Sequence, residues 1–171
     1  RNSALVVAKL FGFGGGQAPL VEGGIVYGHS GFACEPGWAM PVTYGAEATE
    51  ALEAEVAAMG GKSVYLERLR ERDPQAVAVY RKAVENYGSR AALIVNMINP
   101  EVIFFCTDYV QIGQRFLDDV WQAMRPHVSP MSLEGLELRF GGRRSDEERL
   151  AAAALPVLDR LYSEGAFEVP G

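Results

Sequence analysis

The stretch from Gly28 to Val42 contains the residues of this chain that are best suited to binding chemistry. It reads Gly-His-Ser-Gly-Phe-Ala-Cys-Glu-Pro-Gly-Trp-Ala-Met-Pro-Val, and this content of glycine and proline predicts a loop. Glu35 provides a carboxylate, which accepts hydrogen bonds from two neighbouring hydroxyls at once. Trp38 provides a flat apolar ring face on which a ligand can stack.

The residues on the N-terminal side of this loop predict strands. Ser3–Leu10 is β-branched and apolar, which is typical of a central strand. Pro19–Val21 and Gly24–Tyr27 predict two further short strands around a Glu-Gly-Gly turn. Together the three segments favour an antiparallel meander at the start of the chain.

Helical patterns dominate from Ala46 onward. Asp73 and Pro74 predict a helix start, with Asp as N-cap and Pro at the first helical position, and Asn99-Pro100 predicts its end. Further helices are predicted over Ala46–Met59, Ser63–Arg72, Gln111–Ala123 and Ser145–Leu161. The apolar run Val102–Cys106 predicts a strand buried on both faces, and Leu136–Phe140 predicts another strand. This order indicates a mixed α/β domain with helices packed on a sheet.

Length, charge and cysteine content exclude several classes of protein. The 171 residues suffice for one domain with a proper core, and we predict a single domain over residues 1–171. The net charge of −6 argues against nucleic-acid binding by this chain, and the apolar runs are too short for a membrane span. With only Cys34 and Cys106, a reduced cytoplasmic protein is the simpler expectation. Because the chain begins at Arg1 and enters a strand-like run almost at once, we expect it to be a domain of a longer protein.

Three motifs, in this order and at these spacings, resemble the ROK family of repressors, open reading frames and sugar kinases. They are the run Gly12–Gly16 with the hairpin after it, the loop Gly28–Val42, and the passage Ala91–Phe105, which contains Asn-Pro-Glu-Val-Ile. The match covers the family's C-terminal lobe. It implies an RNase H-like, actin-like fold with a mixed sheet, packed helices and most of a homodimer surface. The family's N-terminal lobe, and any helix-turn-helix for DNA, are absent from this chain.

The glycine run departs from the phosphate-binding turn of the family's kinases. That turn reads Gly-Thr-Gly-x-Gly-x-Gly, and its glycines let the backbone approach phosphate closely. Here its first Gly and its Thr are Leu10 and Phe11, so a bulky apolar pair should weaken phosphate binding. We therefore interpret the remaining glycines as a tight turn between strands, a degenerate phosphate turn made of Gly12, Gly14, Gly15 and Gly16.

The family's second nucleotide turn and its zinc site also differ here. The Gly-Gly pair after the Asn-Pro-Glu strand is replaced by Cys106-Thr107-Asp108, and an acid at this place should repel a phosphate. The resemblance places Trp38 at the zinc-binding His, and Tyr44, Ala46 and Ala51 at the three zinc-binding Cys. Because zinc needs three or four such ligands, we predict that zinc is lost and that no cofactor is held.

The resemblance also implies sugar contacts for three residues. Glu35 and Glu53 correspond to family glutamates that accept hydrogen bonds from sugar hydroxyls, and Trp38 could stack a sugar face. Plainer alternatives stay open: Trp38 fills the space of the missing zinc loop, and Glu53 is ordinary helix surface. A complete pocket would need residues of the missing lobe.

The favoured function is a non-catalytic, effector-sensing and dimerising domain of a ROK-type transcriptional regulator. Its effector would be a sugar or sugar phosphate, its partner a second copy, and DNA would bind only through the missing N-terminal domain. The first alternative is the C-terminal lobe of a ROK sugar kinase, whose catalytic Asp lies in the missing lobe and which phosphorylates a hexose with ATP. The second is a degenerate lobe retained only for oligomerisation.

Overall fold

The computed structural model describes residues 4–8, 17–21, 24–26, 28–30, 33–35, 40 and 45–141. The chain divides into two compact units, Arg1–Gly141 and Gly142–Gly171, and every element given below belongs to the first. Three sequence predictions lie outside the described residues: the turn Gly12–Gly16, Trp38 and the helix Ser145–Leu161. These three, and the prediction of a single domain, stay predictions.

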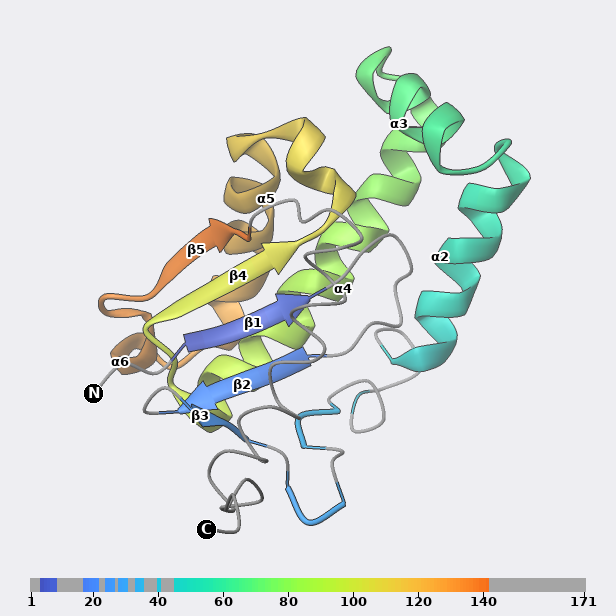
Figure 1. The fold of residues 1–171 in the computed structure, drawn as a ribbon. Coiled ribbons are helices and arrows are strands. Elements are labelled where there is room, and N and C mark those ends of the chain that lie inside the picture. The colour runs from blue at the N-terminus through green and yellow to red at the C-terminus, as the bar shows by residue number, and fades with distance from the viewer. Residues whose placement is uncertain are drawn as a thin grey trace, which may run out of the picture. The chain divides into compact units, whose positions relative to one another are not determined.

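A five-stranded mixed sheet, ordered β3-β2-β1-β4-β5, forms one layer of the first unit (Figure 1). Its strands are β1 (Ala4–Ala8), β2 (Gln17–Val21), β3 (Gly24–Ile25), β4 (Val102–Cys106) and β5 (Glu137–Phe140). The first three are antiparallel, which confirms the predicted meander. β4 runs parallel to β1 and to β5, as expected of strands joined by helical crossovers.

Helices α2 (Ala46–Ala58) and α3 (Lys62–Arg70) form a helical hairpin. The turn between them consists of Gly60 and Gly61, whose φ angles of +99° and +89° suit glycine and few other residues. This confirms the predicted stop after Met59. The second helix begins and ends slightly before the predicted Ser63–Arg72 segment, and its buried residues face the long helix that follows.

Helix α4 (Pro74–Ile98) is the 25-residue centre of the unit. The Asp73 carboxylate caps it by accepting a hydrogen bond from the Ala76 amide at 2.9 Å, and Asn99 ends it in the left-handed conformation at φ +49°. Both signals were predicted from the sequence. Among the described residues, no helix is both long and apolar enough to cross a bilayer.

The segment after β4 differs from the prediction of one helix over Gln111–Ala123. A short 3-10 helix, η1 (Asp108–Ile112), comes first, and Gly113 then starts α5 (Gln114–Met124). Two short helical turns, η2 (Arg125–His127) and α6 (Pro130–Leu133), lead to β5. The 3-10 helix forms because the Thr107 hydroxyl caps it, accepting from the Tyr109 amide, while the Tyr109 side chain is buried.

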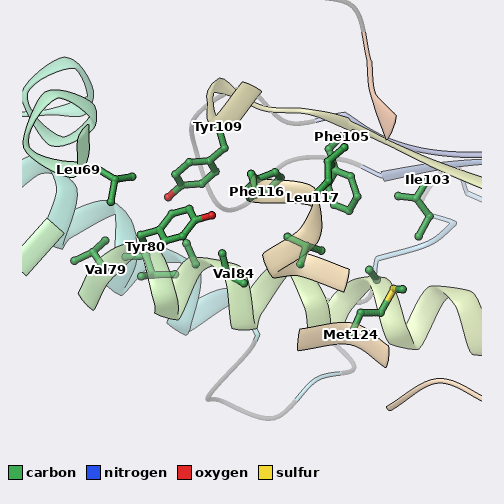
Figure 2. Close-up of a cluster of buried hydrophobic side chains, with 14 of the residues drawn as sticks. Leu69, Val79, Tyr80, Val84, Ile103, Phe105, Tyr109, Phe116, Leu117 and Met124 are labelled. Carbon is green, nitrogen blue, oxygen red and sulfur yellow. The ribbon is translucent and has the colours of Figure 1, made fainter. Parts of the chain in front are cut away.

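The core lies between the sheet and the two helices α4 and α5 (Figure 2). Ile103 and Phe105 of β4 are buried against these helices, whereas the alternate residues of the strand are half-buried. The prediction of a strand buried on both faces therefore holds fully for one face of β4. Gly88 lets α4 and α5 approach closely, since a Cβ there would lie 2.6 Å from the Ala123 Cβ.

The apolar residues that recur at helical spacing along α4 belong to the core. Tyr80, Val84, Ala91 and Ile94 are buried, and Val77, Tyr87 and Ile98 pack against the same cluster. A surface of this kind is used for folding, so the dimer prediction gains no support from it.

Candidate functional site

Glu35 lies exposed at the end of a tightly folded loop segment. The segment turns at His29-Ser30, and Gly28 and Ala33 come so close that a Cβ on Gly28 would lie 3.2 Å from the Ala33 Cβ. Cys34 takes a positive φ of +65°, a conformation that favours glycine. The resemblance places a family Gly at Cys34, so this backbone agrees with the alignment that gives Glu35 its proposed role.

A buried polar centre lies where α4 faces the first turn of α2. Arg90 is only 8% exposed, and its Nη2 donates to the Thr49 hydroxyl at 2.6 Å and to the Gly45 carbonyl at 3.1 Å. The Thr49 hydroxyl itself donates to the same Gly45 carbonyl at 3.2 Å. The three residues therefore form a closed set of hydrogen bonds around the start of α2.

Electrostatics connect this centre to the Glu35 loop. Burial lowers the pKa of the Arg90 guanidinium, and the Tyr87 phenol and the Glu35 carboxylate both oppose that shift. Burial, with a smaller effect of Glu35, raises the pKa of the Cys34 thiol. Cys34 is therefore held as a neutral thiol, which makes it a poor nucleophile. The Glu35 charge thus acts on the buried Arg90.

Glu53 is exposed on α2, four residues after Thr49 and thus one turn further along the same helix. Thr49, Leu52 and Val56 are buried, so the backbone that carries Glu53 is anchored on both sides of it. The Glu35 charge acts on Arg90, and Glu53 follows Thr49, the residue whose hydroxyl accepts from Arg90, by one helical turn. Trp38 lies outside the described residues, so its proposed stacking role stays a prediction.

The residues aligned with the family's zinc ligands do not fit a zinc ion. Ala46 and Ala51 have no ligand atom, and both belong to α2. Within the described residues, His, Cys, Asp and Glu side chains nowhere gather in threes that could hold a metal ion. No step of binding or chemistry is therefore assigned to zinc.

The C-terminal end of β4, where the resemblance places a nucleotide turn, is filled by buried polar side chains. Thr107 and Asp108 are 7% and 4% exposed. The Asp108 carboxylate forms an ion pair with Lys62 of α3, and the Tyr87 hydroxyl donates to the Thr107 hydroxyl at 3.4 Å. These contacts fix the first turn after the strand against two helices. This turn is closed by contacts within the protein, whereas a phosphate-binding turn is open to its ligand.

An aromatic cluster extends from the Thr107-Asp108 turn into the core. Its members are Tyr65, Tyr80, Tyr87, Phe105, Tyr109 and Phe116. The hydroxyls of Tyr65 and Tyr109 are 3.0 Å apart, and the ring of Tyr109 stacks on Phe116 with centroids 5.0 Å apart. Several of these side chains are seen together in Figure 2.

The pKa values of the tyrosines in this cluster are all raised. Burial is the main cause, and it raises the pKa of Tyr65 to about 12. Burial also raises the pKa of Tyr109, with further contributions from the Tyr65 hydroxyl. For Tyr80, burial is joined by the Asp119 carboxylate, which accepts from its hydroxyl at 2.8 Å. All these phenols stay protonated near neutral pH and serve packing and hydrogen bonding.

Sequence reasoning missed Arg90, Thr49 and Lys62. A usable signal existed for Arg90, which follows Tyr87 by three residues and precedes Ile94 by four, and so interrupts the apolar face of α4 with a charge. A charge at such a position needs a buried partner. Nothing local marks Thr49 or Lys62, because their partners are 41 and 46 residues away along the chain.

Comparison with known proteins finds matches only at the level of structure. No family model and no curated protein matches the sequence. The solved structures that resemble the chain are ROK family proteins. One is a ROK family transcriptional regulator, a homologue of the E. coli MLC protein, with 16% identity and a TM-score of 0.58. The match covers 82% of this chain and 42% of that one.

Two ROK sugar kinases match equally well. The ROK hexokinase from Thermus thermophilus is 18% identical with a TM-score of 0.60, over 81% of this chain and 52% of that one. A ROK family glucokinase from Streptomyces griseus, in complex with glucose and AMPPNP, is 17% identical with a TM-score of 0.56, over 81% and 55%. The chain thus spans about half the length of the structures it matches, and at these identities the likeness shows a shared fold.

Proposed function

We propose that this chain is the C-terminal, RNase H-like lobe of a ROK family protein, and that it senses a sugar for a transcriptional regulator. In this proposal Glu35 and Glu53 accept hydrogen bonds from sugar hydroxyls, and Trp38 lies beside them. DNA is bound by a helix-turn-helix elsewhere in the complete protein. The lobe also contributes to a homodimer, whose geometry the sugar shifts by binding one form more tightly than the other.

The proposal that the chain is non-catalytic rests on the burial of the Thr107-Asp108 turn. A phosphoryl-transfer enzyme needs backbone amides and cations around its nucleotide phosphates. Here the chain offers a buried carboxylate whose ion-pair partner, Lys62, belongs to another helix. A phosphate would be repelled by Asp108 and would compete for Lys62, so nucleotide binding at this place is disfavoured.

Sugar sensing is supported by the combination of exposed carboxylates and a buried, hydrogen-bonded arginine. Glu35 and Glu53 are exposed carboxylates, the Glu35 charge acts on the buried Arg90, and Arg90 holds the turn of α2 that precedes Glu53. Exposed acceptors on a rigid support suit hydroxyl-rich ligands, because the protein orders few groups on binding.

The experiment measures sugar binding by the complete protein, using glucose, mannose, N-acetylglucosamine and their 6-phosphates in a calorimetric panel. We expect at least one to bind, and Glu35→Gln to weaken it about tenfold or more, because a charged hydrogen-bond acceptor is lost. Glu101→Gln is the matched control, since it removes an exposed carboxylate just before β4. Equal affinity of wild type and Glu35→Gln would remove Glu35 from the site. Absence of binding by any sugar would contradict sensing.

A ROK sugar kinase is the second candidate function, because hexokinase and glucokinase structures are among the neighbours. In that case the catalytic base would come from the other lobe and transfer phosphate from ATP to a hexose. Formation of a hexose phosphate by the complete protein with MgATP would favour this candidate over the regulator.

Dimerisation is tested by analytical sedimentation of the complete protein at tens of micromolar, a concentration range suited to modest interfaces. We expect a dimer. A monomer at every concentration would contradict the part of the proposal that couples sugar to dimer geometry.

A further inference from the structure

Arg90 is an unusual residue for the middle of a buried helix face. Its neighbours Ala91, Ala92 and Ile94 are each 2% exposed, and its own side chain is nearly as buried. Placing a guanidinium there carries a large desolvation cost, which folding recovers only through good hydrogen bonds. Two of its hydrogen-bond partners, Thr49 and Gly45, belong to the start of α2.

The N-terminus of α2 receives no side-chain cap from its N-cap residue. That residue is Gly45, so the amides of the first turn have no side-chain acceptor there. Asp73 performs that task for α4. In α2 the fixed point is instead the Gly45 carbonyl, which accepts hydrogen bonds from Arg90, from the Thr49 hydroxyl and from the Thr49 amide at 3.3 Å.

From this geometry we infer that Arg90 is a positioning residue of the candidate sugar site, holding the first turn of α2, and through it Glu53, in register with the Glu35 loop. The inference rests on the proposed function for its ligand, a hydroxyl-rich sugar. Arg90 touches no ligand in this account. It acts through Gly45 and Thr49, and its charge is attracted by the Glu35 carboxylate.

The experiment is hydrogen exchange of the amides in Gly45–Ala58, measured in wild type, Arg90→Met, Arg90→Lys and Gly88→Ala. Gly88→Ala is the matched structural control, because it disturbs α4 where that helix meets Ala123 of α5. We expect Arg90→Met to speed exchange of the first hydrogen-bonded amides of α2, from the Thr49 amide onward, about tenfold, the effect of losing hydrogen bonds to a charged donor. Arg90→Lys should restore part of the protection, and Gly88→Ala should leave the first turn no faster than the rest of the helix.

Uniform acceleration along the chain in Arg90→Met, or none in a folded variant, would overturn the inference, because Arg90 would then only pack. Should Arg90→Met fail to fold, Thr49→Val removes the partner hydroxyl at equal volume and is judged by the same exchange pattern against Thr49→Ser. The sugar panel separates the two claims. If Arg90→Met speeds exchange only near the start of α2 and the complete protein binds no sugar, Arg90 positions that turn and sugar sensing is contradicted. If the protein binds a sugar and Arg90→Met leaves the affinity unchanged, only the positioning role is contradicted.

Discussion

The aromatic cluster at the C-terminal end of β4 and the candidate site at the start of α2 use their polar groups in opposite ways. In the cluster, hydroxyls and charges are buried against one another, as in the Tyr65–Tyr109 and Lys62–Asp108 pairs. In the candidate site Arg90 and Thr49 are buried, whereas Glu35 and Glu53 are exposed. The polar groups of the first region are paired within the fold, whereas the second region also has exposed carboxylates.

This difference bears on the two activities of the proteins that share the fold. A sugar kinase needs a nucleotide site and a sugar site, whereas a sugar-responsive regulator needs only the second. The place where the resemblance puts the nucleotide turn is filled here by Thr107, Asp108 and their partners. Variants that act on one region and spare the other therefore test whether the two are separate.

The largest effect should come from Phe116→Ala in the aromatic cluster. Phe116 is fully buried and contacts Tyr87, Phe105 and Tyr109, so removing its ring should cost about 3–5 kcal/mol of unfolding free energy. Urea denaturation measures this, with Phe104→Ala as a control at a half-buried phenyl on the other face of β4. A larger loss of unfolding free energy in Phe104→Ala than in Phe116→Ala would mean that the core packs on the face of β4 that carries Phe104.

Alkaline pH should act on the same cluster. Burial raises the pKa of Tyr65 to about 12, whereas the unfolded chain releases its tyrosine protons near 10. Stability is therefore complete below about pH 10 and falls as the pH rises toward 12, by about 2 kcal/mol for Tyr65 alone. Urea denaturation at several pH values from about 8 to 11 measures the slope, which should be shallower in Tyr65→Phe. An unchanged slope in that variant would show that Tyr65 does not contribute.

Gly88→Ala should have an intermediate effect on the helix that serves both regions. The new methyl would lie 2.6 Å from the Ala123 Cβ, and overpacking of about 1–3 kcal/mol exceeds the gain of about 1 kcal/mol in helix propensity. Thermal and urea denaturation should show a net loss. The double variant Gly88→Ala/Ala123→Gly should be more stable than Gly88→Ala, and no recovery would mean that another contact limits the approach of the helices.

The smallest effect should appear in the Glu35 loop. Cys34→Gly and Cys34→Ala both remove the thiol, but only Gly adopts the φ of +65° without steric cost. Cys34→Gly should therefore be more stable than Cys34→Ala by about 1 kcal/mol in urea denaturation. Equal stability would show that the backbone at this residue is not held in the left-handed region.

Elements with local signals could be predicted from the sequence, and those that depend on distant contacts could not. Asp73-Pro74 and Asn99-Pro100 marked both ends of α4, and the glycine pair marked the end of α2. The 3-10 helix at Asp108–Ile112 was missed, because it depends on Thr107 as a cap and on the burial of Tyr109 against α3 and α4.

The candidate site followed the same rule. Glu35 and Glu53 were proposed through motif resemblance, and their roles stay predictions. Arg90 was not found, because its role depends on Thr49, which lies 41 residues away. A buried arginine within the apolar face of a helix is a signal that sequence reasoning can use, but it does not name the partner.

The measurement that most directly tests this account is a calorimetric titration of the complete protein, first with MgATP and then with the sugar that the panel identifies. We predict no heat of binding from MgATP, and saturable sugar binding that Glu35→Gln weakens and Asp108→Asn leaves unchanged. Saturable binding of MgATP, made tighter by Asp108→Asn, would contradict the account, because the end of β4 would then be a working nucleotide site.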